Sequence, residues 1–333
     1  MSSPGAGTAL IGLAGIAAGA ALVLLHLTSG TPALSPAEVG QAFGADPDDP
    51  TRLIVVDIRL TRVIVGVLAG AALGTVGALL QDGLRNPLAT PELLGVSGGA
   101  ALIVAIITVL HAPVPRVAMP LLATVGGIAI GLAVVAASAR AREPATLLLV
   151  GVASSTFLSG CVIAIVTLGR PSDVGLFYQF LLGSLANRSW DSVWTVLPLV
   201  VVGFPLALAL TPSLNTMRLG DAVASGLGVR VGLVRNAVLA LGGLLTAGVV
   251  AVAGPIGFVA LLAPHLTRLL LGTVDARWVV PLSGVVGAVL LLAADTLGRA
   301  AVQPREVAVG VWTVLVGAPA LLLLLRLPRR ALP

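Results

Sequence analysis

Ten apolar stretches, each about 20 residues long, follow one another along this chain of 333 residues. Charged residues make up only 10% of the sequence, against about 25% in a soluble domain. Stretches of this kind cross a bilayer as helices, because a helix satisfies its backbone hydrogen bonds internally. The alternating pattern of a membrane β-barrel is missing. The sequence therefore predicts an all-α polytopic membrane protein with one transmembrane domain over residues 1–333, and it excludes a soluble enzyme.

The predicted spans are regularly distributed along the chain. They cover residues 8–28, 62–82, 94–110, 117–138, 145–168, 192–210, 236–253, 256–271, 279–298 and 308–325. An even number of spans places both termini on one side. The excess of arginine on that side predicts that both termini face the cytoplasm, in a plasma (inner) membrane.

Two loops between the spans are long, 30–58 on the outer side and 211–235 on the inner side. The second loop contains residues 219–229, which predict one or two short amphipathic helices interrupted by glycines. Such helices either lie on lipid or receive force from a soluble partner. The pattern alone leaves both possibilities open.

The charged and sulfur-containing residues exclude several classes of site. All 19 basic residues are arginine, so a P-loop lysine for nucleotide phosphates is missing and the chain cannot carry an ordinary ATP site. The arginines are scattered between apolar runs, which argues against nucleic-acid binding. Cys161 is the only cysteine, and the three histidines are far apart in the sequence. We therefore expect no cofactor, no metal site and no catalytic residue.

Glycines recur on one face of the second span, at Gly66, Gly70, Gly74 and Gly77. Small residues at this spacing let helices approach closely. The stripe indicates either tight helix packing or a smooth wall of a passage, and packing is the favoured interpretation.

Two segments break the apolar pattern between spans. The first, 85–99, carries Asn86, Pro87, Gly95 and Ser97, and the second, 254–258, carries Gly254, Pro255 and Gly257. Irregular backbone at membrane depth is tolerated only where protein or water covers it. Interrupted segments in both halves of a transporter are typical of a translocation pathway.

Charged residues occur at the predicted outer ends of two spans. Asp295 and Arg299 are four residues apart, so we expect them to pair on one helix face, although an intramembrane carboxylate is also a candidate proton carrier. Arg59 and Arg62 either reach toward lipid headgroups or, with Arg299, form a docking point for acidic side chains of an extracytoplasmic protein.

Several short motifs occur in an order that is specific to one family. They are Arg59-Leu60-Thr61-Arg62, Gly77-Ala78-Leu79-Leu80-Gln81, Arg85-Asn86-Pro87-Leu88-Ala89, Leu94-Gly95-Val96-Ser97, Leu182-Gly183-Ser184-Leu185, Leu219-Gly220-Asp221 with Leu227-Gly228-Val229, Gly254-Pro255-Ile256-Gly257-Phe258-Val259 with Pro264-His265, Asp295-Thr296-Leu297 with Arg299, and Val309-Gly310 with Gly317-Ala318-Pro319. From about residue 55 to 325 the chain resembles the permease subunits of ABC importers for iron–siderophores, haem and vitamin B12, the FecCD family.

The resemblance implies a vitamin B12 permease-like fold with ten helices and a second permease, identical or related. It also implies ATP-binding cassette ATPase subunits below and an extracytoplasmic substrate-binding protein above. Arg59, Arg62 and Arg299 match the family's docking arginines. The implied ATPase-coupling residues are Leu219, Gly220, Asp221, Ala224, Gly226, Leu227 and Gly228.

The expected function is ATP-driven import of ferric siderophores by alternating access, with vitamin B12 or haem as alternative substrates. A rival from another class is a secondary transporter driven by an ion gradient through Asp295, and a non-transporting scaffold is a second rival. Thr61, Asp82 and Trp312 depart from the family pattern. Trp312 is bulkier than the family's usual aliphatic residue, and we expect it to alter the shape of the pathway. The sequence therefore constrains the identity of the substrate least.

Overall fold

The computed structural model describes residues 4–115, 118–138, 144–301 and 306–326, and these residues form helices without any strand. Ten elements correspond to the predicted spans. They are α1 (Pro4–Thr28), α4 (Thr61–Gly83), α5 (Val96–Val109), α6 (Met119–Ser138), α7 (Pro144–Val166), α9 (Trp190–Met217), α11 (Val231–Ala253), α12 (Val259–Leu271), α13 (Ala276–Ala300) and α14 (Val309–Arg326). Residue 117, predicted to begin the fourth span, lies outside the described residues.

Length and composition support a membrane-spanning bundle. Seven helical stretches are long and apolar enough to cross a membrane, and three shorter apolar helices lie at Val96–Val109, Val259–Leu271 and Val309–Leu324. The described residues therefore contain a helix at each of the ten predicted positions. The all-α polytopic prediction is confirmed.

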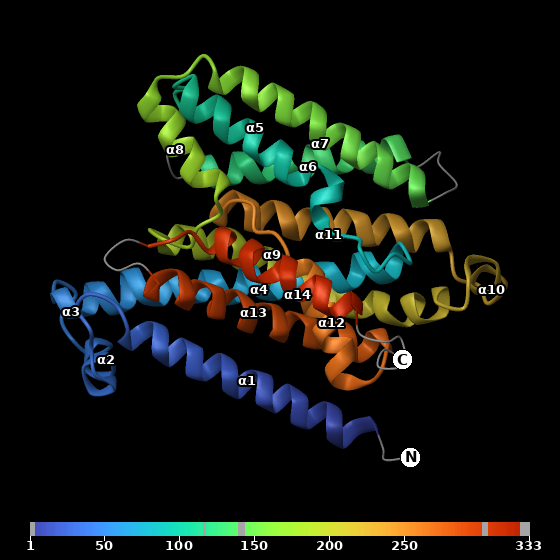
Figure 1. The fold of residues 1–333 in the computed structure, drawn as a ribbon, viewed down its shortest axis with the longest axis horizontal. Coiled ribbons are helices and arrows are strands. Elements are labelled where there is room, and N and C mark those ends of the chain that lie inside the picture. Colours follow the sequence, from blue (N-terminus) through green and yellow to red (C-terminus); the bar gives the residue numbers. More distant parts are fainter. Residues whose placement is uncertain (1–3, 116–117, 139–143, 302–305, 327–333) are drawn as a thin grey trace.

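Short helices mark the two ends of the bundle, as Figure 1 shows. The α3 end carries α2 (Pro36–Ala42), α3 (Pro50–Arg52) and α8 (Pro171–Leu181), and the α10 end carries α10 (Asp221–Gly226). Helix α1 begins and α14 ends at the α10 end, so the chain makes an even number of crossings (Figure 1). This agrees with termini on one side, and which side is cytoplasmic stays a prediction.

Helix α4 occupies the centre of the bundle and packs most extensively against α13. Its glycine stripe makes this contact possible. A Cβ atom added to Gly74 would lie 2.0 Å from the carbonyl oxygen of Ser283, and one added to Gly77 would lie 1.7 Å from that of Ala260. The stripe is therefore a packing surface against α13 and α12, the favoured interpretation of the sequence.

Two local predictions were wrong, and one helix was not predicted. The second spanning helix begins at Pro50 rather than residue 62, because α3 runs through a π-helix, η1 (Leu53–Leu60), directly into α4. Most of the predicted loop 211–235 is helical, since α9 continues to Met217 and α11 begins at Val231. Helix α8 was not predicted, because its eleven residues are too few and too polar to resemble a span.

Candidate functional site

Three chain breaks meet at the α3 end of the bundle. The backbone N–H of Ser184, after α8, donates to the carbonyl of Ala253 at 2.7 Å, and that of Gly310 donates to Gly183 at 3.0 Å. A Cβ atom on Gly183 would lie 2.3 Å from the carbonyl oxygen of Pro255, and Gly183 has a φ of +65°. Glycine is required here because backbone approaches backbone in a left-handed conformation.

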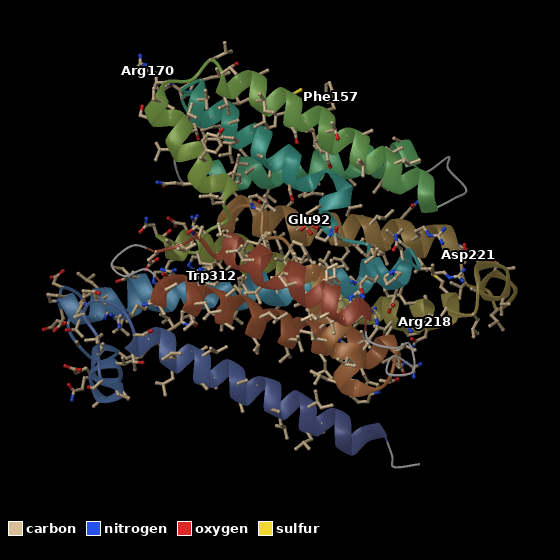
Figure 2. All side chains as sticks on the ribbon, in the orientation of Figure 1. Glu92, Phe157, Arg170, Arg218, Asp221 and Trp312 are labelled. Atoms are coloured by element: carbon tan, nitrogen blue, oxygen red, sulfur yellow. The ribbon has the colours of Figure 1, made fainter. Side chains whose placement is uncertain are left out.

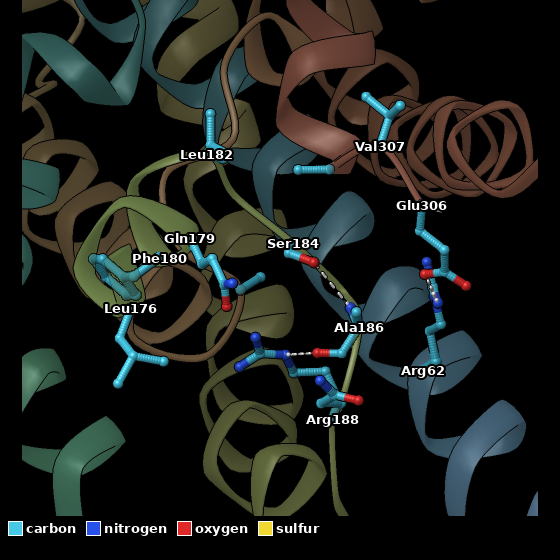
Figure 3. A pocket seen from close by; sticks show the side chains of 13 residues that line it. Arg62, Leu176, Gln179, Phe180, Leu182, Ser184, Ala186, Arg188, Glu306 and Val307 are labelled. Atoms are coloured by element: carbon cyan, nitrogen blue, oxygen red, sulfur yellow. Dashed lines mark hydrogen bonds and ion pairs between the residues drawn. The ribbon is translucent and has the colours of Figure 1, made fainter. Parts of the chain in front are cut away.

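A cavity of about 380 Å³ opens beside this junction (Figure 3). Its wall comes from the end of α8, the loop 182–188, Ala253 and the segment 306–308, together with one side chain of α4. The lining is Arg62, Leu176, Gln179, Phe180, Leu182, Ser184, Ala186, Asn187, Arg188, Ala253, Glu306, Val307 and Ala308. Its volume lies within the range of about 300–1,000 Å³ typical of small-molecule pockets.

A cluster of buried charges lies next to the cavity. The Nε and Nη2 atoms of Arg62 each donate to the Asp295 carboxylate at 2.8 Å, and Nη1 donates to Glu306 at 2.7 Å. The Nε2 atom of His26 lies 3.1 Å from the same aspartate. The Asp295 side chain is only 2% exposed. Its carboxylate is thus fully occupied by protein partners.

The predicted pair between Asp295 and Arg299 is wrong. Asp295 pairs with Arg62, 233 residues away in the sequence, because α4 and α13 pack side by side. Arg299 instead donates to the carbonyls of His26 and Ser29, at 3.2 and 2.5 Å. It thereby satisfies the free carbonyls at the end of α1.

The three predicted docking arginines gather at the α3 end but are engaged within the chain. Arg59 is 5% exposed and donates to the carbonyls of Leu27 and Pro32. The side chains of Arg62 and Arg299 are 12% and 13% exposed. Arg170, before α8, is the exposed arginine at this end that Figure 2 labels. Docking at the three predicted arginines stays a prediction.

Arg188 is a site residue that the sequence reasoning missed. Its Nε donates to the carbonyl of Ala186 at 3.0 Å, and Nη1 donates to the carbonyl of Val252. The hydroxyl of Thr61 donates to the carbonyl of Arg188 at 2.9 Å, which links this loop to α4. Burial, and then the nearby charge of Arg62, lower the pKa of Arg188. Its position just after the Leu182–Leu185 motif was the available signal.

The α10 end carries a second network of charges. Asp221 of α10 contacts Arg235 at 3.1 Å and Arg85 at 3.7 Å, and Arg235 also donates to the carbonyl of Gly83 at 3.3 Å. These contacts connect α10 to the end of α4.

Asp82 forms the centre of this network. It accepts from Arg218 at 2.7 Å and from Arg268 at 3.0 Å, and so joins the ends of α4, α9 and α12. A pocket of about 260 Å³ opens here, lined by Gln81, Asp82, Arg85, Pro87, Arg218 and Arg268.

The predicted coupling residues project from the bundle at α10. Leu219, Val223 and Leu227 are 63%, 50% and 65% exposed, whereas Ala224 is buried against the bundle. Gly220 and Gly228 have φ values of +107° and +88°. The glycines therefore shape the turns on both sides of a short helix that presents apolar side chains outward.

The predicted helix breaks lie in two places. Asn86 and Pro87 turn the chain at the α10 end, where the Asn86 side chain accepts from the N–H of Leu88 at 2.9 Å. Gly95, with a φ of +70°, begins α5, and Ser97 lies in its first turn. These residues are separate from Gly254, Pro255 and Gly257, which join α11 to α12 beside the cavity.

Among the described residues, no group of three histidine, cysteine or carboxylate side chains is placed to hold a metal ion. What the site offers is a polar cavity at one end, a charged network at the other, and closely packed glycine-rich helices between them.

Comparison with known proteins places the chain in a family. The model of the FecCD transport family matches residues 18–327. The chain is 36% identical over 285 residues to a Fe(3+)-citrate import system permease of Bacillus subtilis, covering 85% of each chain. It is 35% identical to the hemin transport system permease of Yersinia pestis, covering 91% of this chain and 92% of that one.

A further relative is the cobalamin import system permease of Halobacterium salinarum, 39% identical over 84% of this chain and 74% of that one. A solved structure of an inward-facing metal-chelate type ABC transporter superposes with a TM-score of 0.83. It has 25% sequence identity and covers 95% of this chain and 98% of that one. The chain therefore belongs to the FecCD transport family of multi-pass membrane permeases.

Proposed function

We propose that this chain is the transmembrane subunit of an ATP-driven importer of ferric siderophores. The observation that carries the proposal is the family match over residues 18–327, together with relatives named for iron-chelate import. Relatives are also named for hemin and cobalamin import, and these remain the alternative substrates. The permease performs no covalent chemistry, and its contribution is the relative stability of inward- and outward-open states.

The proposed mechanism requires a second permease, ATPase subunits and a substrate-binding protein. The exposed apolar side chains of α10 supply a surface for the ATPase, since an unpartnered apolar patch of this kind favours contact with protein. Asp221 and Arg235 then connect α10 to α4, so that a displacement of α10 reaches the centre of the bundle.

The ion-gradient mechanism through Asp295 is disfavoured by the contacts of that residue. A carboxylate that carries a proton must alternate between its protonated and its deprotonated form. Asp295 is held by two hydrogen bonds from Arg62 and lies within hydrogen-bonding distance of His26. We therefore propose that Asp295 has a structural role, as a buried charged residue paired with Arg62.

Uptake of radiolabelled chelates tests the substrate. Cells that lack the gene, and the same cells complemented with it, are given a panel of ferric siderophores, hemin and cobalamin, with and without depletion of ATP. We expect the deleted cells to lose the ATP-dependent uptake of a ferric siderophore. Loss of cobalamin or hemin alone would overturn the substrate and keep the transport mechanism.

Gly228→Pro is expected to uncouple ATP hydrolysis from transport. Proline fixes φ near about −65°, whereas Gly228 has a φ of +88°. Proline also removes the N–H that Gly228 donates to the carbonyl of Ser225 at 3.0 Å. A Cβ atom at this position would meet nothing within 4 Å, so the damage stays local to the turn after α10. Transport per ATP hydrolysed should fall at least about tenfold, and Gly226→Pro should behave alike.

The matched control is Gly232→Ala, which also faces open space but lies in the first turn of α11. It should leave coupling unchanged. Full coupling in the assembled Gly228→Pro transporter would refute the role of the 219–229 segment.

Reversing the charge of Arg59, Arg62 and Arg299 together is expected to weaken docking of the binding protein at physiological salt by about tenfold or more. Because Arg59 is buried and all three arginines have partners in the chain, the variant must first elute and melt as a folded protein. Arg170→Glu is the control for an exposed charge at the same end. If the folded triple variant binds the binding protein with unchanged affinity, these arginines do not form the docking point.

A further inference from the structure

The cavity at the α3 end carries an excess of positive charge. Two arginines and one glutamate line it among the described residues. Glu306 is committed to Arg62, with an Nη1 to Oε2 distance of 2.7 Å, and lies 3.9 Å from the Nε of Arg299. Asp295, which lies next to the cavity, also forms an ion pair with Arg62. No described carboxylate forms an ion pair with Arg188, so its charge is left uncompensated.

Arg188 is also held in place before any ligand arrives. Two of its N–H groups bond to the backbone carbonyls of Ala186 and Val252. A guanidinium carries five N–H donors in a rigid fork, so three donors remain. Figure 3 shows the guanidinium beneath Gln179, on the same side of the cavity as α8. A fixed cation with free donors is the arrangement that recognises a carboxylate or another planar oxygen anion.

The remaining wall combines apolar surface with hydrogen-bonding groups. Leu176, Phe180 and Val307 supply apolar surface, and Gln179 and Ser184 supply hydrogen-bonding groups. The wall therefore offers a fixed cation, hydrogen-bonding groups and apolar contact to a chelate whose outer ligand oxygens carry negative charge.

We propose that this cavity receives the anionic rim of a carboxylate-type ferric chelate, and that Arg188 is the residue that favours anionic over neutral chelates. The inference rests on the proposed import function and adds to it the chemical class of the substrate. The cavity of about 380 Å³ accepts a compact chelate or one edge of a larger one.

Equilibrium binding to the permease in lipid nanodiscs, without the binding protein, tests the inference. The probes are radiolabelled ferric citrate, which is anionic, and a neutral ferric trihydroxamate. Arg188→Gln should weaken ferric citrate binding by about tenfold or more, as expected for a lost charge-assisted hydrogen bond. It should change binding of the neutral chelate less than about twofold, and Arg188→Lys should restore part of the affinity, because it returns the charge without the fork.

Glu306→Gln provides a test of opposite sign that does not depend on Arg188. The Glu306 side chain is 42% exposed, and Arg62 keeps Asp295 as a partner, so the fold should tolerate the change. Removing the negative charge should tighten ferric citrate binding severalfold and leave the neutral chelate unchanged. Opposite shifts for the two variants, confined to the anionic probe, would support the proposal even if Arg188→Gln is poorly folded.

Three results would overturn the inference. They are equal effects of each variant on both chelates, unchanged ferric citrate binding in folded variants, and no binding of ferric citrate by the unmodified permease. ATP-dependent uptake by the complete transporter, measured in parallel, separates this failure from that of the proposed function. If the unmodified transporter imports ferric chelates and Arg188→Gln imports ferric citrate with an unchanged KM, the inference alone fails. If no ferric chelate is imported, both fail.

Discussion

Asp295→Ala is expected to destabilise the permease so strongly that little folded protein remains in the membrane. Asp295 is almost completely buried and receives two hydrogen bonds from Arg62, with His26 as a further contact. Deleting Asp295 removes two of the three carboxylate contacts of Arg62 and leaves only Glu306, which is 42% exposed, to balance that charge. We therefore expect a cost close to that of a broken buried ion pair, about 3–5 kcal/mol. The amount of monodisperse protein extracted from membranes, and its thermal unfolding, measure the loss.

Glu306→Ala is the matched control, because Glu306 also pairs with Arg62 but is partly exposed. We expect it to cost no more than about 1 kcal/mol. The double variant Asp295→Leu with Arg62→Met should regain part of the stability that Asp295→Ala loses, since it leaves no buried charge unpaired. If Asp295→Ala is fully folded but inactive, the carboxylate carries protons or cations, and the structural interpretation fails.

Gly77→Ala is expected to disrupt the packing of α4 on α12. The added methyl carbon would lie 1.7 Å from the carbonyl oxygen of Ala260 and 2.6 Å from its carbonyl carbon. Both atoms belong to backbone, so neither can turn away and the helices must separate. Overpacking typically costs about 1–3 kcal/mol and occasionally more, and we expect the upper end or beyond, seen as a large drop in the unfolding temperature.

Gly232→Ala again serves as the comparison, because it meets no atom within 4 Å and should stay within about 0.5 kcal/mol of the parent. A Gly77→Ala protein that melts like the parent but no longer transports would favour the alternative interpretation, in which the glycine stripe lines a passage.

Much of the fold follows from the sequence for a simple reason. In a membrane the apolar span is a local property, so composition alone locates the helices at the ten positions. The same logic fails for α8, whose eleven residues are too short to span. It also fails for the stretch 50–61, where Arg52, Asp57 and Arg59 hide the start of a helix that continues to Gly83.

The site was less predictable because its contacts are between helices. Spacing of four residues correctly places Asp295 and Arg299 on one helix, but it says nothing of Arg62, which approaches from α4. Arg188 and Glu306 are single charged residues in loops, and only the junction of three chain breaks brings them to one cavity. The motif at Leu182–Leu185 was visible, whereas its contact with Pro255 and Gly310 was not.

We infer that ATP hydrolysis on a separate chain drives a ferric chelate through this permease. This mechanism is tested most directly in proteoliposomes that contain the permease with its ATPase, supplied with binding protein and ferric siderophore outside. We expect the ferric siderophore to accumulate inside only when ATP is present on the ATPase side, and collapsing the proton gradient should not affect this accumulation. Accumulation that follows an imposed proton or cation gradient without ATP would contradict it.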